Sequence, residues 1–269
     1  MIQLPNETLP NHVTLSLSAY QQEVDDSGTY MARVASAKLL FGQRNRRDQP
    51  VFRSIRESLD TMCRGPRRCM YCEDSVADEV EHFRPTDLYP EMVFVWENYL
   101  YACGPCNGPK NTRFAVFSTA TGAAVETARP RGAVILEPEP GNPVLIDPRH
   151  EDPLAFMQLD LQGTFLFRES NPPGTLQHTR ANYTIQVLHL NDREYLRLGR
   201  ELAYEDCYSI LESYIGARNA GRPQNYLDRK IRAIRRKAHQ TVWAEMKRQR
   251  QSIAAVGALF AAAPEALNW

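Results

Sequence analysis

The chain is 269 residues long, with 43% hydrophobic and 24% charged residues, which are ordinary values for a soluble globular protein. Lysine plus arginine and aspartate plus glutamate each number 32, so the formal net charge is zero. A general electrostatic attraction to nucleic acid is therefore excluded, and any such binding must depend on local basic clusters.

The first residues, MIQLPNETLPNH, lack the basic start and apolar run of a signal peptide. No apolar stretch approaches the ~18 residues that a membrane-spanning helix needs. These observations predict a cytoplasmic protein with no membrane partner. In a reducing compartment, cysteines in close pairs indicate metal binding rather than disulfide bonds.

The chain divides into four predicted segments. Residues 1–59 form an N-terminal helical segment, because apolar residues recur there at helical spacing. Residues 60–118 hold five of the six cysteines. Residues 119–180 are rich in loops, with a β-hairpin predicted at FMQLDLQGTFLF, which alternates about a central glycine. Residues 181–269 form a C-terminal helical region.

Two helices are predicted in the C-terminal region. Asn191 and Glu194 have the spacing of a helix cap and its partner. Further on, apolar residues three or four apart predict one long helix over roughly 225–250. Lysine and arginine are concentrated at 229–250, with shorter basic clusters at 42–47 and 64–68. The long cluster fits a DNA-binding face, a solvated helix face or a docking surface for an acidic partner.

Four cysteines form two C-x2-C pairs that frame the second segment. Two such knuckles present four thiolates to one ion, which suits tetrahedral Zn²⁺ and leaves no open position. The alternative is four buried free thiols. Cys63 and Cys207 remain outside the pattern, and Cys207 is expected in a helical core. The predicted ligands of structural zinc are Cys69, Cys72, Cys103 and Cys106.

Between the two cysteine pairs lie an acid-histidine dipeptide and an asparagine, and a second asparagine follows the last cysteine. EVEHFRP is predicted as a short strand ending at Pro85, YLYAC as a second strand, and NGPKNTRF as the start of a helix at Asn107. The expected local structure is therefore β-β-α, with zinc at its ends.

The stretch from Cys69 to Arg113 resembles zinc-containing HNH endonucleases, whose pattern is C-x2-C, acid-His, Asn, C-x2-C-[HN] and then Lys. The resemblance implies an α+β protein. Its centre would be a zinc-stapled ββα-metal module of the HNH, treble-clef-like type, and this module would be embedded in a mostly α-helical scaffold. It also implies hydrolysis of phosphodiester bonds in nucleic acid, with duplex DNA as the expected substrate rather than RNA.

The whole chain also resembles the HNH subunit of Septu and retron-associated antiphage systems. The similar segments are MIQL, EHFRP, WEN, LIDPRHEDP and TIQVLHLN. This resemblance implies antiviral defence and an ABC-like or SMC-like ATPase partner.

The HNH resemblance assigns roles to four polar residues. His82 is the expected general base, since a neutral imidazole suits proton abstraction near neutral pH. Asn98 is expected to hold the His82 ring through a hydrogen bond. Glu81 and Asn107 are the expected ligands of a catalytic Mg²⁺ or Mn²⁺, because hard cations prefer oxygen. Successive strand residues face opposite ways, so Glu81 and His82 are expected on two sides of one phosphate.

Basic residues near this motif are candidates for phosphate contacts. They are Arg84, Lys110 and Arg113. Each can equally be a solvated surface charge.

Two other interpretations stay open. The module can be a zinc-bound adaptor for nucleic acid or protein without catalysis, or an RNA-cleaving enzyme of the same kind. Separately, IDPRHEDP is either a proline-bounded polar turn or a second metal or acid-base site, formed by Asp147, His150, Glu151 and Asp152.

Overall fold

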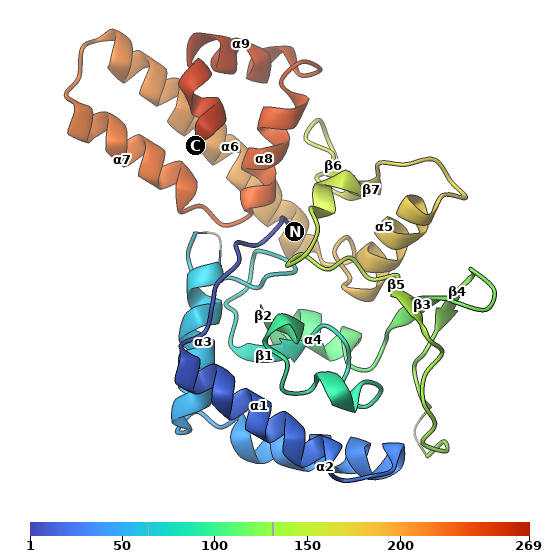
Figure 1. Cartoon of the computed structure of the whole chain (residues 1–269). Coiled ribbons are helices and arrows are strands. Elements are labelled where there is room, and N and C mark those ends of the chain that lie inside the picture. Colours follow the sequence, from blue (N-terminus) through green and yellow to red (C-terminus); the bar gives the residue numbers. More distant parts are fainter. Residues whose placement is uncertain (64, 131) are drawn as a thin grey trace.

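The computed structural model describes residues 1–63, 65–130 and 132–269. It combines helices at both ends of the chain with short strands in the middle, so the protein is a mixture of helix and sheet (Figure 1). Within the described ranges, no helix has the length and apolar character to cross a membrane.

The N-terminal part consists of α1 (Asn11–Asp25), α2 (Tyr30–Arg44) and α3 (Pro50–Met62). Proline at the first position of α3 suits a helix start, because the missing N–H would have no partner there. Helix α3 buries one face, formed by Phe52, Ile55, Leu59 and Met62. In Figure 1 these helices lie below and beside the first strand pair.

The central strand pair consists of β1 (Glu79–His82) and β2 (Tyr99–Ala102), which run antiparallel with His82 opposite Tyr99. Short 3₁₀ turns lie between them at Pro90–Met92 and Trp96–Asn98. Helix α4 (Gly104–Lys110) follows directly.

Both expected strands are present, although the first ends at His82 and not at Pro85. The helix expected to begin at Asn107 begins three residues earlier, at Gly104. The proline in its first turn has no backbone N–H that would lack a partner there, which favours this earlier start.

The segment after α4 forms two small sheets. Strands β3 (Ala115–Ser118), β4 (Ala124–Glu126) and β5 (Gly141–Pro143) form an antiparallel sheet in the order β4-β3-β5. The sequence did not indicate this sheet. Strands β6 (Met157–Leu159) and β7 (Phe167–Glu169) form the hairpin that the sequence predicted. A 3₁₀ turn at Pro153–Ala155 precedes β6.

The C-terminal region is helical and lies above the central strands in Figure 1. Its elements are α5 (Leu176–Val187), α6 (Glu194–Asn219), α7 (Gln224–Arg235), α8 (Gln240–Gln249), α9 (Ala254–Ala262) and a 3₁₀ turn at Pro264–Asn268.

Two sequence-based expectations about these helices were wrong. Asn191 does not cap α6, because its side chain bonds the backbone of Phe167 at 2.8 and 2.9 Å. The single helix over 225–250 is broken between α7 and α8, where His239 takes a left-handed backbone conformation with φ of 56°.

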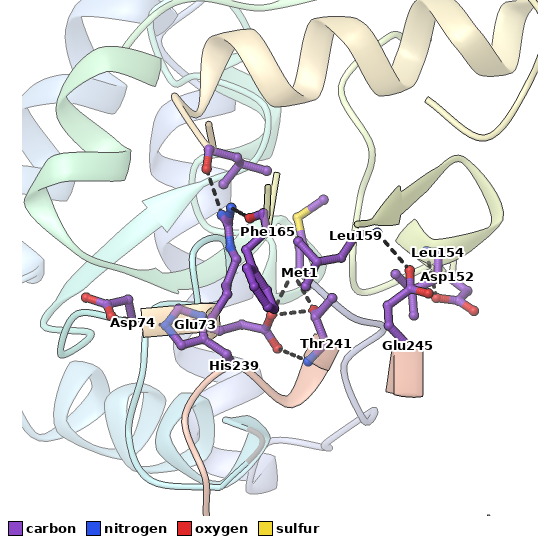
Figure 2. A network of polar contacts seen from close by, with 12 residues as sticks. Met1, Glu73, Asp74, Asp152, Leu154, Leu159, Phe165, His239, Thr241 and Glu245 are labelled. Carbon is purple, nitrogen blue, oxygen red and sulfur yellow. Dashed lines mark hydrogen bonds and ion pairs between the residues drawn. The ribbon is translucent and has the colours of Figure 1, made fainter. Parts of the chain in front are cut away.

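At the break between the helices, His239 contacts the two residues that follow the first cysteine pair. Its ring nitrogen Nε2 lies 3.1 Å from Asp74 Oδ1, and its N–H donates to the Glu73 carbonyl at 3.3 Å. The Glu73 carboxylate also accepts from the Thr241 N–H at 3.2 Å and from the amine of Met1 at 2.7 Å (Figure 2). These contacts hold the start of α8 against the cysteine-bearing loop.

A second buried carboxylate holds α8 against the β6–β7 hairpin. Glu245 is fully buried and accepts from the Leu159 N–H at 3.0 Å, from Arg248 Nε at 2.9 Å and from Gln249 Nε2 at 2.8 Å (Figure 2 shows the Leu159 contact). These contacts satisfy a backbone donor and two side chains inside the protein.

We expect Glu245→Ala to lower the free energy of unfolding by about 1–3 kcal/mol, because it leaves the buried Leu159 N–H without an acceptor. Urea denaturation followed by circular dichroism measures this change. Glu212→Ala, at an exposed position of α6, is the matched control and is expected to have little effect. Equal stability of the two variants would contradict the assigned role of Glu245.

Candidate functional site: a cysteine cluster and the adjoining polar pocket

Four buried cysteine side chains meet at one point beside the central strands. The Sγ atoms of Cys69, Cys72, Cys103 and Cys106 all lie within 4.8 Å of one another. The Cys72 and Cys103 sulfurs are 3.8 Å apart. Four thiolates around Zn²⁺ at ~2.3 Å in tetrahedral geometry have edges of about 3.8 Å. The predicted convergence of the two cysteine pairs is confirmed, and the cluster suits a structural metal such as zinc.

Backbone hydrogen bonds connect this cluster to the neighbouring elements. The Met70 N–H donates to the Tyr101 carbonyl at 2.9 Å, so the first cysteine pair is attached to β2. Cys103 follows β2 directly, and Cys106 lies within the first turn of α4. A metal held by the four sulfurs would therefore join the loop after α3, the end of β2 and the start of α4.

An arginine from a distant part of the chain contacts the cluster. Arg193 Nη2 lies 3.2 Å from Cys106 Sγ. Four thiolates around Zn²⁺ carry a net charge of −2, and a guanidinium beside one sulfur offsets part of it. Sequence reasoning missed Arg193, because 87 residues separate the two side chains and nothing local links them.

The two remaining cysteines stay outside the cluster, as the spacing indicated. Cys63 contacts the carbonyls of Leu59 and Arg68, and burial raises the pKa of its thiol to about 11. Cys207 lies in the buried face of α6, and burial raises the pKa of its thiol to about 12. Both are neutral core side chains at neutral pH.

The acid-histidine dipeptide opens on a pocket of about 350 Å³ between β1, α2 and α4. Glu81 and His82 line it from β1, and Asn107 lines it from α4. The lining from α2 and the loop after β1 includes Lys38, Phe41 and Asp87. Three of the predicted site residues therefore share one pocket.

His82 is held in one orientation by its surroundings. Its Nε2 lies 2.9 Å from the Val93 carbonyl, which can only accept, so Nε2 carries the hydrogen and Nδ1 is the unprotonated nitrogen. The ring packs edge-on against Phe41 and Tyr99, at centroid distances of 4.4 and 5.1 Å. Burial lowers the pKa of His82 to about 4, so the ring is neutral near pH 7.

Asn98 does not make the hydrogen bond to His82 that was expected. Its Oδ1 accepts from the Arg84 N–H at 2.7 Å, and its Nδ2 donates to the carbonyls of Arg84 and Met92 at 3.1 and 2.9 Å. The amide thus joins the end of β1 to the loop that presents the Val93 carbonyl. Asn98 therefore contacts the loop that carries the carbonyl partner of the His82 ring, and not the ring itself.

Lys110 also differs from expectation, since it is fully buried and out of reach of a phosphate in this conformation. Its Nζ forms an ion pair with Glu81 Oε1 and donates to the His82 carbonyl at 2.8 Å. The Lys110 ammonium is thus the charged partner of the Glu81 carboxylate. Burial raises the pKa of Glu81, and the Lys110 charge opposes that shift.

The Asn107 amide is oriented by a carboxylate that sequence reasoning missed. Its Nδ2 donates to Glu79 Oε2 at 2.7 Å, which leaves Oδ1 as the free end of the amide. Glu79 lies two residues before Glu81 on β1, and so on the same face of the strand. A buried carboxylate and an amide oxygen, both lining one pocket, are ligand types that fit Mg²⁺ or Mn²⁺, although Lys110 already pairs with the carboxylate.

The other two expected phosphate contacts lie away from this lining. The Arg84 guanidinium stacks over the rings of Tyr89 and Phe114 at 4.9 and 5.4 Å, and it lines a neighbouring cavity of about 670 Å³. Arg113 is exposed just beyond α4. Lys38, which the sequence did not single out, lines the pocket and pairs with Asp87 at 2.8 Å.

The IDPRHEDP segment forms a polar turn with several internal contacts. His150 Nδ1 lies 2.8 Å from Asp147 Oδ2, Glu151 pairs with Arg180, and Asp152 accepts from the Leu154 N–H at 3.0 Å. Among the described histidine, cysteine and acidic residues, the cysteine quartet alone has the geometry of a metal-binding group. The described residues thus give no ligand group for a metal at this segment, while Asp147, His150 and Glu151 line the same cavity as Arg84.

The basic stretch 229–250 is divided by the break at His239. On α8, Arg248 pairs with the buried Glu245. The cations on and just after α7 are different, because they are exposed and have no carboxylate partner among the described residues. These are Arg229, Arg232, Arg235 and Arg236.

The end of α7 meets the short basic cluster beside the first cysteine pair. The backbone of Gly65, at φ of 85°, packs against the carbonyls of Arg235 and Lys237. The cluster at 64–68 thus adjoins the α7 cations, although its first residue, Arg64, lies outside the described residues. Two basic clusters that are distant in sequence come together here.

Fold and site together define a mixed helix-and-sheet protein with a four-cysteine cluster suited to zinc. Over 50 residues, the chain is 48% identical to "Septu protein PtuB" of Bacillus thuringiensis. That stretch covers 17% of this chain and 20% of the relative, so the similarity concerns one segment and not the whole protein. No protein-family model and no solved structure match the chain.

We expect the purified protein to contain one zinc ion per chain, measured by plasma mass spectrometry. Cys103→Ser removes one thiolate ligand, so the zinc content and the thermal midpoint of unfolding should both fall. Cys207→Ala is the matched control, because this cysteine lies outside the cluster and should leave the zinc content unchanged. Full zinc occupancy in Cys103→Ser would rule out a four-thiolate site.

Proposed function

We propose that the chain is a metal-dependent HNH endonuclease that hydrolyses phosphodiester bonds in DNA. The observation that carries this proposal is the shared pocket of Glu81, His82 and Asn107 beside the four-cysteine cluster. Each residue of this set has a chemical task in phosphodiester hydrolysis. The HNH sequence pattern adds support, because it places the same residue types in the same order.

In the proposed reaction, His82 accepts a proton from the attacking water through Nδ1. Its neutral state and fixed Nε2–H make Nδ1 available for this task. Glu81 and Asn107 would hold the divalent cation, Mg²⁺ or Mn²⁺, through oxygen atoms. A cation bound there supplies charge stabilisation at the phosphate and the leaving 3′ oxygen. The products carry 5′-phosphate and 3′-hydroxyl ends.

Basic residues around the pocket would position the DNA backbone. Arg84 and Arg113 remain candidates, and Lys38 joins them because its ammonium lies at the pocket itself. The exposed α7 cations extend the candidate surface, since clustered basic residues bind phosphates through counterion release.

We further propose that the protein is the nuclease effector of an antiphage defence system and acts with an ATPase of the ABC or SMC type. The similarity to Septu protein PtuB supports this role. Co-expression with an ATPase encoded beside the gene tests it. A stable complex that restricts phage growth is expected, and loss of restriction in His82→Ala would connect defence to cleavage.

A zinc-bound adaptor without catalysis is the second candidate. The ion pair between Lys110 and Glu81 favours it, because the carboxylate proposed to bind the metal already has a cationic partner. The same pocket also allows RNA as the substrate. Cleavage assays with DNA and RNA of matched sequence separate these possibilities.

We expect His82→Ala to lower the DNA cleavage rate by about 10²–10⁴-fold with Mg²⁺ or Mn²⁺, because the general base is removed. Supercoiled plasmid and labelled duplexes report cleavage, with and without the ATPase partner. His12→Ala, an exposed histidine on α1, is the matched control. If His82→Ala cuts DNA as fast as the parent, the nuclease assignment fails.

We expect Arg229→Glu combined with Arg232→Glu to weaken DNA binding for all sequences alike. The logarithm of the affinity should also depend less steeply on the logarithm of the salt concentration, by about 0.9 for each DNA phosphate that the variant no longer neutralises. Fluorescence anisotropy at several salt concentrations measures both effects. Arg168→Glu, at an exposed cation on β7, has the same change in net charge as either single variant, Arg229→Glu or Arg232→Glu, and is their matched control. An unchanged salt slope would exclude α7 from the DNA interface.

A further inference from the structure

Both carboxylates that line the pocket of Glu81 and His82 are paired with lysines. Lys110 Nζ contacts Glu81 Oε1, and Lys38 Nζ lies 2.8 Å from Asp87 Oδ2. These four charges cancel. The nearby Glu79 carboxylate receives the neutral amide of Asn107, so it keeps its negative charge, and it has no cationic partner among the described residues. The two carboxylates of the pocket lining are therefore neutralised, and Glu79 beside them supplies a single uncompensated negative charge, which is little to attract a divalent cation.

The two lysines differ in how firmly they are held. The Lys38 side chain is 58% exposed, so solvent screens its charge. Lys110 is fully buried, and its ammonium has the Glu81 carboxylate and the His82 carbonyl as partners. A buried ammonium that loses its carboxylate is left without charge compensation, which is costly. Lys110 is thus the stronger obstacle to a second cation at Glu81.

Like charges repel strongly in a poorly solvated pocket. A divalent cation at Glu81 Oε1 must either share the carboxylate with the Lys110 ammonium or displace it. Asn107 is neutral and adds a ligand oxygen without adding negative charge. One paired carboxylate and one amide are therefore a weak site for Mg²⁺ or Mn²⁺ by themselves. A phosphodiester in the pocket changes this balance, because it brings one negative charge and further oxygen ligands.

From this geometry we propose that Lys110 makes divalent-cation binding at Glu81 and Asn107 conditional on a bound phosphodiester. The inference rests on the proposed nuclease function and adds its regulation. Lys110 is the internal counter-ion of Glu81 in the free protein, and the DNA backbone provides the charge that allows the metal to bind. By linkage, the metal tightens DNA binding by the same factor as DNA tightens metal binding.

The test measures Mn²⁺ affinity in the zinc-loaded His82→Ala protein, which keeps Glu81, Asn107 and Lys110 and is expected to cut DNA slowly. Electron paramagnetic resonance reports free and bound Mn²⁺, with and without a duplex oligonucleotide. The duplex alone, and the duplex with a Glu81→Gln/His82→Ala protein, correct for Mn²⁺ that binds DNA directly. We expect the duplex to raise the Glu81-dependent affinity about tenfold or more.

Adding Lys110→Met to this protein removes the ammonium and keeps an unbranched apolar side chain of similar length. We expect Mn²⁺ then to bind without DNA, with an affinity close to that of the Lys110 protein with DNA. Equal Mn²⁺ affinity of the two proteins without DNA overturns the proposal. Tight Mn²⁺ binding to the Lys110 protein without DNA also overturns it.

A second measurement does not need the Lys110 variant to fold. In a crystal structure of His82→Ala with Mn²⁺ and duplex, we expect anomalous scattering to place the ion ~2.1–2.4 Å from a Glu81 oxygen. Lys110 Nζ should have moved away from that carboxylate. An ion at Glu81 with the Lys110 ion pair intact overturns the counter-ion role. Failure of any state to bind Mn²⁺ through Glu81 overturns the nuclease proposal itself, and with it this inference.

Discussion

The convergence of four cysteine sulfurs within 4.8 Å is the contact on which the rest of the site depends. A strand pair of four residues each is too short to be stable alone. A metal bound at this point would join the loop after α3, the end of β2 and the start of α4 through strong, directional bonds. It would thereby keep Asn107, one residue beyond Cys106, at a set position relative to β1.

Burial explains why the polar groups of the pocket have so many partners. His82, Glu81 and Lys110 are all buried, and a buried polar group without a partner is costly. The Val93 carbonyl, the Lys110 ammonium and the His82 carbonyl satisfy these needs within a small region. The same pairing restrains chemistry, because a carboxylate that stabilises a lysine is less available to a metal ion. At Glu81, the ion pair that stabilises the free protein therefore competes with binding of the proposed metal ion.

The C-terminal helices participate in this arrangement through the first cysteine pair. Glu73 and Asp74 directly follow Cys72, and they bind Thr241 and His239 at the start of α8 (Figure 2). Arg193, just before α6, reaches Cys106. Hydrogen bonds therefore attach α8 and the residue before α6 to the elements that carry the cysteine cluster.

The sequence by itself determined the features that depend on short spacing. Two residues between paired cysteines allow a tight turn that presents both sulfurs to one ion, whatever surrounds it. Alternation about a glycine was enough to predict the β6–β7 hairpin, and the acid-histidine dipeptide indicated the pocket. Tertiary structure decided the features whose partners are distant or carry no side-chain signature. Any residue can offer a carbonyl, so Val93 could not be foreseen as the partner of His82. Lys110 looked like a surface cation until the fold buried it against Glu81, and the apolar periodicity over 225–250 could not show that the helix breaks at His239.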